Sequence, residues 1–294
     1  VDLLEGSPPS ASFSMAGKRE AGWNQVKAYS DTKQRTDDLF FEFARLVDGL
    51  QPKVFVAENV KGLTIGKARG YLKEILAALR GCGYKVKCAV LDAQFFGVPQ
   101  HRERLIFIGV REDLGMEPTF PRPAQKPHIV AQMHPSKVPG FGPREFTDAA
   151  AAPSPTIGSS VNSGNGRSSP TEVLAETDIS RYAIGDEWDK LKPGEQSEKY
   201  FQLVKADPDK PVSTVLQSSA AFPSAAFPSA ACAGHPFEKR KFTIPELKRI
   251  CGFPDDFILT GTFAQQWERL GRAVAPPMMA AVAAHIRETI LQGS

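Results

Sequence analysis

The chain begins with the stretch Val1-Asp2-Leu3-Leu4-Glu5-Gly6-Ser7-Pro8-Pro9-Ser10-Ala11-Ser12-Phe13-Ser14, in which an apolar run leads into two consecutive prolines. The apolar start predicts a buried strand over 1–4, and the two prolines fix their own φ and push each preceding residue into an extended conformation. The backbone leaving the strand therefore has little freedom, so we expect Ser10 to be held in one place. A proline-stiffened surface turn is the alternative interpretation.

Outward from this stretch, the apolar pattern predicts an alternation of helices and strands. The predicted helices cover 37–50, with Thr36 as N-cap, and 68–80; the predicted strands cover 1–4, 53–60, 84–91 and 104–110. This order is typical of an α/β fold with a mostly parallel sheet covered by helices. The polar pair Glu58-Asn59 follows a buried strand, where open α/β sheets bind their ligands.

The composition changes between about Glu112 and Gly234, where proline, serine, glycine and alanine dominate. We interpret this region as a small, loop-rich second domain with short strand-like pieces at 155–157 and 212–216. A duplicated pentapeptide at 220–229 has no assigned function. Helical order returns at Thr243-Ile244-Pro245-Glu246, which has the form of a capping box, and a last helix is predicted over 277–291.

Charge and cysteine content exclude few classes of function. The net charge is +3, which is too small to indicate nucleic acid by itself, and no apolar stretch is long enough to span a bilayer. The N-terminus has no secretory signal, so the expected location is cytoplasmic, bacterial or phage nucleoid-associated. Neither a metal site nor a disulfide framework is indicated by the four cysteines, Cys82, Cys88, Cys232 and Cys251.

Five motifs occur in the order found in the DNA cytosine-5 methyltransferases, which the chain resembles over almost its whole length. Gly6-Ser7-Pro8-Pro9-Ser10 resembles the nucleophile motif of that family, and Glu58-Asn59-Val60 resembles its Glu-Asn-Val motif. The remaining three are Gln100-His101-Arg102-Glu103-Arg104; then Arg240, Thr243, Glu246, Arg249 and Gly252-Phe253-Pro254; and last Gln266 with Gly271-Arg272-Ala273-Val274-Ala275-Pro276-Pro277.

The resemblance implies an incomplete Rossmann-like methyltransferase sheet with a small, irregular target-recognition domain. It divides the chain into a partial catalytic domain (1–115), a target-recognition region (116–235), and a segment (236–294) that ends the recognition domain and returns a helix to the catalytic domain. The expected reaction transfers a methyl group from S-adenosylmethionine to carbon 5 of a cytosine flipped out of duplex DNA. Restriction-modification is the corresponding biological setting.

The resemblance also assigns roles to individual residues. Ser10 stands at the nucleophile position, Glu58 would meet ring nitrogen N3, Asn59 would orient its surroundings, and Arg102 and Arg104 would share one face of an extended segment. A surface charge pair with Glu103 is the alternative for these arginines. The cofactor positions are Pro8, Gly271, Ala273 and Val274; the DNA-binding positions are Gln100, Arg240 and Thr214. Thr243 and Glu246 are expected to be structural. Lys239-Arg240-Lys241, with Lys248 and Arg249, are expected to form a basic patch that contacts phosphate or solvent.

Two departures from the family pattern predict negligible activity. Serine replaces the nucleophilic cysteine at Ser10, and its hydroxyl needs a general base that this loop does not offer. The glycine-rich loop that holds S-adenosylmethionine in the family is not found in the sequence, and Arg272 stands where the family usually has asparagine. We therefore expect either a partner chain that supplies the missing half at the strand edge 1–4, or a truncated fragment.

Two functions of other classes compete with this interpretation. The first is a non-catalytic DNA-binding or regulatory subunit that kept the base-flipping surface. The second is an α/β hydrolase that uses Ser10, which is disfavoured because the Gly-x-Ser-x-Gly elbow is not present and no Asp and His are placed to complete a triad in that family's order.

Overall fold

A computed structural model describes residues 1–8, 27–29, 32–34, 39–66, 68–130, 177–200, 203–216 and 232–292. The chain forms two compact units, one comprising residues 1–128 with 274–294 and the other comprising 129–273. Ser10, the predicted cap Thr36, the strand-like piece 155–157 and the duplication at 220–229 lie outside the described residues. No helix in the described part of the chain is both long enough and apolar enough to cross a bilayer.

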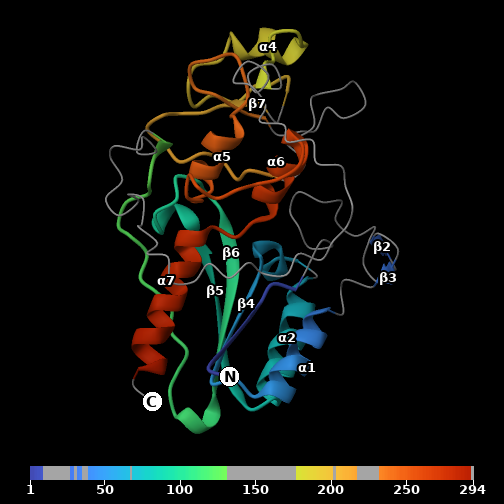
Figure 1. The fold of residues 1–294 in the computed structure, drawn as a ribbon, viewed down its shortest axis with the longest axis vertical. Helices are drawn as coiled ribbons and strands as arrows, with labels where there is room; N and C mark the ends of the chain where they lie inside the picture. The colour runs from blue at the N-terminus through green and yellow to red at the C-terminus, as the bar shows by residue number, and fades with distance from the viewer. Residues whose placement is uncertain are drawn as a thin grey trace. The chain divides into compact units, whose positions relative to one another are not determined.

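The first unit is built on a four-stranded sheet with the order β1-β4-β6-β5 (Figure 1). The strands are β1 (Leu3–Gly6), β4 (Val54–Val60), β5 (Tyr84–Asp92) and β6 (Glu103–Arg111). β1 pairs in parallel with β4, whereas β6 pairs antiparallel with both β4 and β5. The expectation of a mostly parallel sheet is therefore wrong. Parallel neighbours need a long crossover, usually a helix, and the segment 93–102 between β5 and β6 is too short to provide one.

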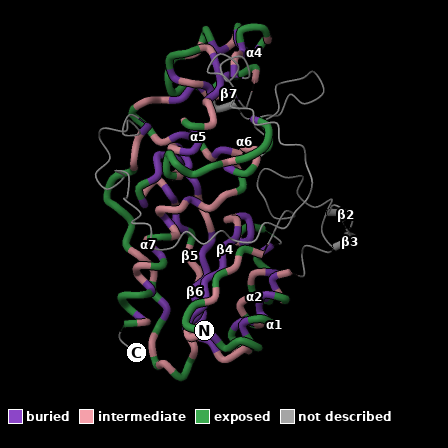
Figure 2. The backbone as a smooth tube through the Cα atoms, in the orientation of Figure 1, coloured by how far each residue is buried: buried purple, intermediate pink, exposed green. Residues whose placement is uncertain are grey.

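Helices cover both faces of this sheet. α1 (Leu39–Leu50) and α2 (Ala68–Gly81) lie on one face, and α7 (Pro276–Ile286), continued by a π-helical turn at Arg287–Leu291, lies on the other (Figure 1). Figure 2 shows the buried residues running along the central strands, and all but the last residue of β4 are buried. Because helices cover both faces of the sheet, side chains on either face of β4 are removed from water. This explains why β4 is apolar up to Glu58.

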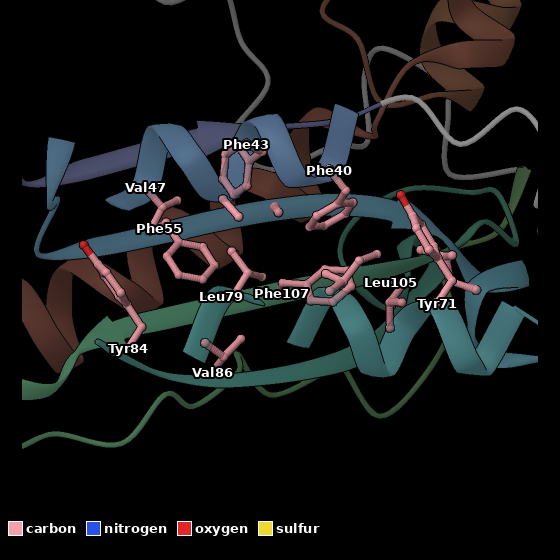
Figure 3. Close-up of a cluster of buried hydrophobic side chains, with 14 of the residues drawn as sticks. Phe40, Phe43, Val47, Phe55, Tyr71, Leu79, Tyr84, Val86, Leu105 and Phe107 are labelled. Atoms are coloured by element: carbon pink, nitrogen blue, oxygen red, sulfur yellow. The ribbon is translucent and has the colours of Figure 1, made fainter. Parts of the chain in front are cut away.

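The core between the sheet and the helices α1 and α2 is rich in aromatic side chains (Figure 3). Phe43 of α1 meets Phe55 of β4 edge-on, with ring centroids 5.8 Å apart. Two glycines make room for these rings: the ring of Phe55 occupies the space over Gly109, and a Cβ atom at Gly6 would lie 2.6 Å from the ring of Phe43. α1 therefore packs directly against the end of β1.

Short elements complete the first unit. They are the strands β2 (Lys27–Tyr29) and β3 (Thr32–Gln34), which pair antiparallel, and the 3₁₀ turns η3 (Lys61–Thr64), η4 (Ala93–Phe95) and η5 (Glu112–Leu114).

The second unit contains α4 (Ala183–Trp188), α5 (Ile244–Ile250), α6 (Phe263–Arg272) and the parallel pair β7 (Leu203–Lys205) and β8 (Cys232–Gly234). The predicted capping box is confirmed, because Thr243 and Glu246 exchange their hydrogen bonds at the start of α5. The predicted strand-like piece 212–216 forms no strand ladder, although Val212 and Val215 are buried in the core beside α5 and α6. α6 was not predicted as a helix, although Thr262 and Gln265 form a second capping box.

Candidate functional site

The central feature of the first unit is a buried ion pair between β4 and β6. Antiparallel pairing places Val60 opposite Arg104, so that Arg104 lies beside Glu58 on the same face of the sheet. Arg104 Nε donates to Glu58 Oε1 at 2.8 Å, and the two side chains are only 12% and 11% exposed. The sequence predicted both residues for the site, and the structure brings them into direct contact.

The environment of Glu58 favours its protonated form. Burial raises the pKa of the carboxyl group, and the positive charges of Arg104 and Arg102 only partly oppose this effect. Burial also lowers the pKa of the Arg104 guanidinium, although its contact with Glu58 counteracts the change. A carboxyl group that keeps its proton closer to neutral pH is suited to donate that proton to a bound ring nitrogen.

Asn59 connects the end of β4 to the start of the proline loop. Its Nδ2 donates to the carbonyl oxygen of Pro8 at 3.2 Å, and its Oδ1 accepts from the amide of Val60 at 2.7 Å. Pro8 therefore has a defined position relative to Glu58. The next residues of the loop, including Ser10, lie outside the described residues, so the placement of Ser10 beside Glu58 stays a prediction.

Asp92 organises the loop between β5 and β6, and the sequence interpretation did not assign it a role. Its carboxylate accepts from the backbone amides of Gln94 and Arg102, and it lies 2.5 Å from His101 Nδ1. An aspartate at a strand end before a tight turn is a signal that could have identified it. Arg102 is 1% exposed, and its guanidinium lies 3.5 Å from Gln100 Oε1, which is also buried.

The alternative of a surface charge pair with Glu103 is wrong for Arg104. Lys61 Nζ lies 2.7 Å from Glu103 Oε1, whereas Arg104 pairs with Glu58. Neighbouring residues of a strand point to opposite faces, so Glu103 faces away from the ion pair. The alternation of side chains along β6 therefore places the Lys61–Glu103 ion pair and the Arg104–Glu58 ion pair on opposite faces of the sheet.

The DNA-binding positions predicted in the second unit have different surroundings. Arg240 is buried and donates through Nη1 and Nη2 to both carboxylate oxygens of Glu246, at 2.8 and 2.9 Å. Its Nε donates to Glu238 at 2.7 Å. Thr214 is half-buried in the segment that crosses the core. A phosphate contact by Arg240 would compete with these internal hydrogen bonds.

The predicted basic patch beside α5 is used largely within the unit itself. Lys248 Nζ donates to the carbonyl oxygens of Asp255 and Phe257 at 2.6 and 2.7 Å. Arg249 Nε donates to the carboxylate of Asp255 at 2.8 Å. Both cations therefore stabilise the turn after α5.

The positions predicted for the cofactor are small or apolar. Pro8 follows β1 and is half-buried, Gly271 lies in the last turn of α6, and Ala273 and Val274 follow it. S-adenosylmethionine carries an amino group, a carboxylate, ribose hydroxyls and a sulfonium, and these four side chains offer no polar partner for any of them. By themselves they do not make a site for the cofactor.

Comparison with known proteins gives one consistent result. A family model described as C-5 cytosine-specific DNA methylase matches residues 1–288. The type II methyltransferase M1.HphI of Haemophilus parahaemolyticus is 32% identical over 96% of this chain and 67% of its own length. The type II methyltransferase M.PspPI of a Psychrobacter species is 30% identical over 93% of this chain and 61% of its own length. The chain thus spans about two thirds of the length of these curated relatives.

Solved structures show the same fold. One is the crystal structure of a DNA modification methyltransferase encoded within an Escherichia coli prophage, with a TM-score of 0.66 and 22% identity over 99% of this chain and 80% of that one. A second is the Dnmt2 methyltransferase of S. pombe, with a TM-score of 0.53 and 12% identity over 98% of this chain and 77% of that one. These likenesses support the Rossmann-like methyltransferase fold.

Proposed function

Because the chain belongs to the C-5 cytosine-specific DNA methylase family, we propose that it binds duplex DNA and holds a flipped cytosine against Glu58 and Arg104. The observation that carries this proposal is the buried Glu58–Arg104 contact at 2.8 Å, one residue from the Asn59 amide that holds the proline loop. Functionally, we propose residues 1–115 as a partial catalytic domain, 116–235 as the target-recognition region, and 236–294 as its end with the returning helix.

The chemistry of cytosine explains why an acid and a guanidinium belong together. Carbon 5 becomes nucleophilic only after addition at carbon 6, which leaves charge on the ring that a proton at N3 would neutralise. Glu58 would donate that proton, and Arg104 would hold its carboxyl group and face the base carbonyl. Arg102 would add positive charge behind Glu58, and Gln100 and Thr214 are proposed to contact DNA.

S-adenosylmethionine would supply the methyl group from its sulfonium centre. The predicted cofactor positions offer only close approach of their backbone to S-adenosylmethionine, so the polar partners of the cofactor must come from other residues. These positions are Pro8, Gly271, Ala273 and Val274. We propose that a segment carrying the family's glycine-rich loop completes the pocket, either on the same polypeptide or on a second chain. β1 is an edge strand of the described sheet, and its unpaired backbone groups could accept a further strand.

Ser10 leads us to propose negligible methyl transfer by this chain. A serine hydroxyl is a far weaker nucleophile than a cysteine thiolate unless a general base activates it. The test measures transfer of labelled methyl groups from S-adenosylmethionine to duplex DNA by the native sequence and by Ser10→Cys. Each is assayed with and without the N-terminal half of a related enzyme.

The expected result is transfer only by Ser10→Cys with the added half. Transfer by the native chain alone would contradict the proposed inactivity. A non-catalytic DNA-binding or regulatory subunit, which Ser10 itself favours, is the second candidate function. This second candidate predicts that Ser10→Cys transfers no methyl groups even with the added half, while the chain still binds DNA.

Base flipping can be tested without catalysis. Duplexes retained by the chain are recovered from a random pool, and each cytosine is replaced in turn by fluorescent pyrrolocytosine, which brightens when it leaves the stack. We expect one position to brighten with the native chain and to stay dark with Arg104→Met. The matched control Arg111→Met removes an arginine at the opposite end of β6 and should leave the signal unchanged. No brightening at any position would contradict the proposal.

A further inference from the structure

The loop between β5 and β6 carries an exposed histidine near the candidate site. The family resemblance gives roles to Gln100 and Arg102 but none to His101, which stands between them. His101 comes three residues before Arg104 and just before the start of β6, so it lies at the same end of the sheet as the Glu58–Arg104 pair. That pair is buried, whereas the side chain of His101 is 52% exposed. His101 therefore faces solvent at the end of the sheet where the proposed function places the flipped cytosine.

Asp92 holds the imidazole ring of His101 by one of its two nitrogens. Asp92 Oδ2 lies 2.5 Å from His101 Nδ1, a distance too short for two hydrogen-bond acceptors, so Nδ1 carries a proton and donates it to the carboxylate. Gln94 Nε2, which lies 2.9 Å from Nδ1, donates to the same carboxylate oxygen at 2.6 Å. The other oxygen accepts from the backbone amides of Gln94 and Arg102, at 3.3 and 3.0 Å. Four donors fix the carboxylate, and the carboxylate fixes the ring.

This arrangement decides what the second ring nitrogen can do. Because Nδ1 of His101 keeps its proton in both charge states, a change of pH changes only Nε2. Nε2 accepts hydrogen bonds when the ring is neutral and donates when the ring is an imidazolium. A phosphate oxygen only accepts hydrogen bonds, so a ring held by Asp92 can donate to phosphate through Nε2 only in its charged form. Histidine side chains change charge between about pH 5 and 8.

We propose that His101, oriented by Asp92, contacts a backbone phosphate of the DNA beside the flipped cytosine, and does so only when its ring is protonated. The inference rests on the proposed function, since it adds a DNA contact to that site. A base held against Arg104 stays joined through its sugar to the phosphates on either side of it. Those phosphates lie on the solvent side of the buried pair, where His101 is exposed. DNA binding by this chain therefore tightens as pH falls through the range in which histidine takes up charge.

Other charged and titratable groups surround this loop and define the controls. Lys61 Nζ lies 2.7 Å from Glu103 Oε1, so these two side chains pair with each other at the start of β6. Arg102 is 1% exposed and stays charged over the whole range. His128 is half-buried, and its Nδ1 lies 3.4 Å from the carbonyl oxygen of Gln94. His128 is therefore the neighbouring group whose titration the test must separate from that of the proposed contact.

The test compares the salt dependence of DNA binding at pH 6 and pH 8. A duplex retained by the full chain from a random pool is labelled, and its dissociation constant is measured by fluorescence anisotropy over a series of NaCl concentrations. Each phosphate that a cation neutralises adds about 0.9 to the slope of log K against log salt concentration. We expect the native slope to be steeper at pH 6 than at pH 8 by about 0.5 to 0.9. His101→Gln should show the shallower slope at both pH values, and His101→Lys, which keeps a positive charge, the steeper slope at both.

The matched controls are His128→Gln and His285→Gln. The second removes a histidine of α7 whose Nε2 lies 2.8 Å from Thr119 Oγ1. Both controls should keep the native difference in slope. A difference in His101→Gln equal to the native one would overturn the proposal.

The role of Asp92 is tested by Asp92→Asn, which allows the neutral ring to move its proton to Nε2 and to donate at either pH. The native gain in affinity from pH 8 to pH 6 should then fall by at least half. An undiminished gain would overturn the orienting role of Asp92. A measurement without DNA checks the same point: ¹⁵N shifts of the His101 ring, assigned by their loss in His101→Gln, should show the proton on Nδ1 at alkaline pH. A proton on Nε2 would contradict the orientation.

Failure of this inference and failure of the proposed function give different results. Duplex binding with equal slopes at the two pH values would overturn the His101 contact and leave the proposed function standing. No duplex retained at either pH would contradict the proposed function and the contact with it, whatever tautomer the ring has.

Discussion

The two units of this protein each contain a glutamate–arginine pair, and the two pairs have opposite electrostatics. Glu58 meets Arg104 through a single Nε contact, whereas Glu246 receives both Nη groups of Arg240. Burial raises the pKa of Glu58 above its usual range. Burial acts in the same direction on Glu246, but hydrogen bonds from Arg240 and Thr243 outweigh it and hold the pKa of that carboxyl below its usual range.

The carboxyl groups of Glu246 and Glu58 differ in the number of hydrogen-bond donors that contact them. Glu246 accepts from the Arg240 fork and from the backbone amide and hydroxyl of Thr243, so its charged form is fully satisfied. Glu58 has fewer donors and a carboxylate neighbour. The Glu246–Arg240 pair, whose hydrogen bonds are all made, stabilises the start of α5. The Glu58–Arg104 pair has fewer donors, so Glu58 holds a proton that it can transfer. The same two residue types therefore serve structure in one unit and, as proposed, chemistry in the other.

The largest expected effect follows from breaking the satisfied pair. Arg240→Met should lower the free energy of unfolding of the second unit by about 3 kcal/mol, because it leaves the buried Glu246 without its main partner. Urea denaturation followed by the fluorescence of Trp188 and Trp267, both buried in that unit, measures the change. Arg249→Met, which removes a more exposed partner of Asp255, is the control and should cost less than about 1 kcal/mol. Equal losses would remove the contrast between the pairs.

Glu246→Gln should cost about 1–2 kcal/mol at pH 7, since it weakens both the arginine fork and the cap of α5. The pKa of Glu246 is lowered in the folded state, so its contribution is present above the unfolded pKa and is lost as pH falls through the folded value. The cost of the substitution should therefore begin to decline as pH falls past the ordinary value of 4.5 and should disappear only below the lower, folded pKa. Urea titrations at several pH values measure it, and a cost that persists unchanged at low pH would contradict the assignment.

Arg104→Met should cost only about 1 kcal/mol, although the pair is as buried as that of Arg240. Glu58 can take up a proton when its partner is removed, which spares the fold an unpaired charge. The loss of stability should grow as pH rises, because without Arg104 the buried Glu58 is tolerated only in its protonated form. Denaturation of the variant between pH 6 and 9 measures this, and a loss matching that of Arg240→Met would show that Glu58 cannot neutralise.

The smallest expected effect belongs to Glu58→Gln, which should change stability at pH 7 by less than about 0.5 kcal/mol. The raised pKa of Glu58 contributes stability that is full below the unfolded pKa and lost as pH rises through the folded value. The neutral amide should abolish this decline, so the variant should become the more stable protein at alkaline pH. Thermal unfolding of both proteins from pH 5 to 9 compares them; parallel curves would refute the raised pKa.

Local sequence signals predicted much of this structure. The strands over 53–60, 84–91 and 104–110 and the helix over 68–80 agree with the observed elements to within about two residues, because short apolar runs mark the strands and a helical apolar period marks the helix. Strand direction was not predictable from those patterns. It depends on the short connection 93–102, whose length excludes a crossover whatever the strands contain.

The site was partly predictable for the same reason. Glu58 and Arg104 were identified as motif positions, but their contact requires the antiparallel register that pairs Val60 with Arg104, which is a property of two distant segments. Asp92 was missed because it lies outside a motif and acts through its neighbours. Arg240 was assigned to DNA from its motif, whereas its surroundings tie it to Glu246.

The space beside Gly6, which the ring of Phe43 fills, determines what can be redesigned in this protein. The ring of Phe43 occupies the space where any other residue would carry its Cβ atom, so position 6 tolerates no side chain while α1 keeps that phenylalanine. Libraries that randomise the proline loop should therefore begin after this glycine. Libraries that include position 6 must also replace Phe43 with a smaller residue, because its ring fills the space that a side chain at position 6 would need.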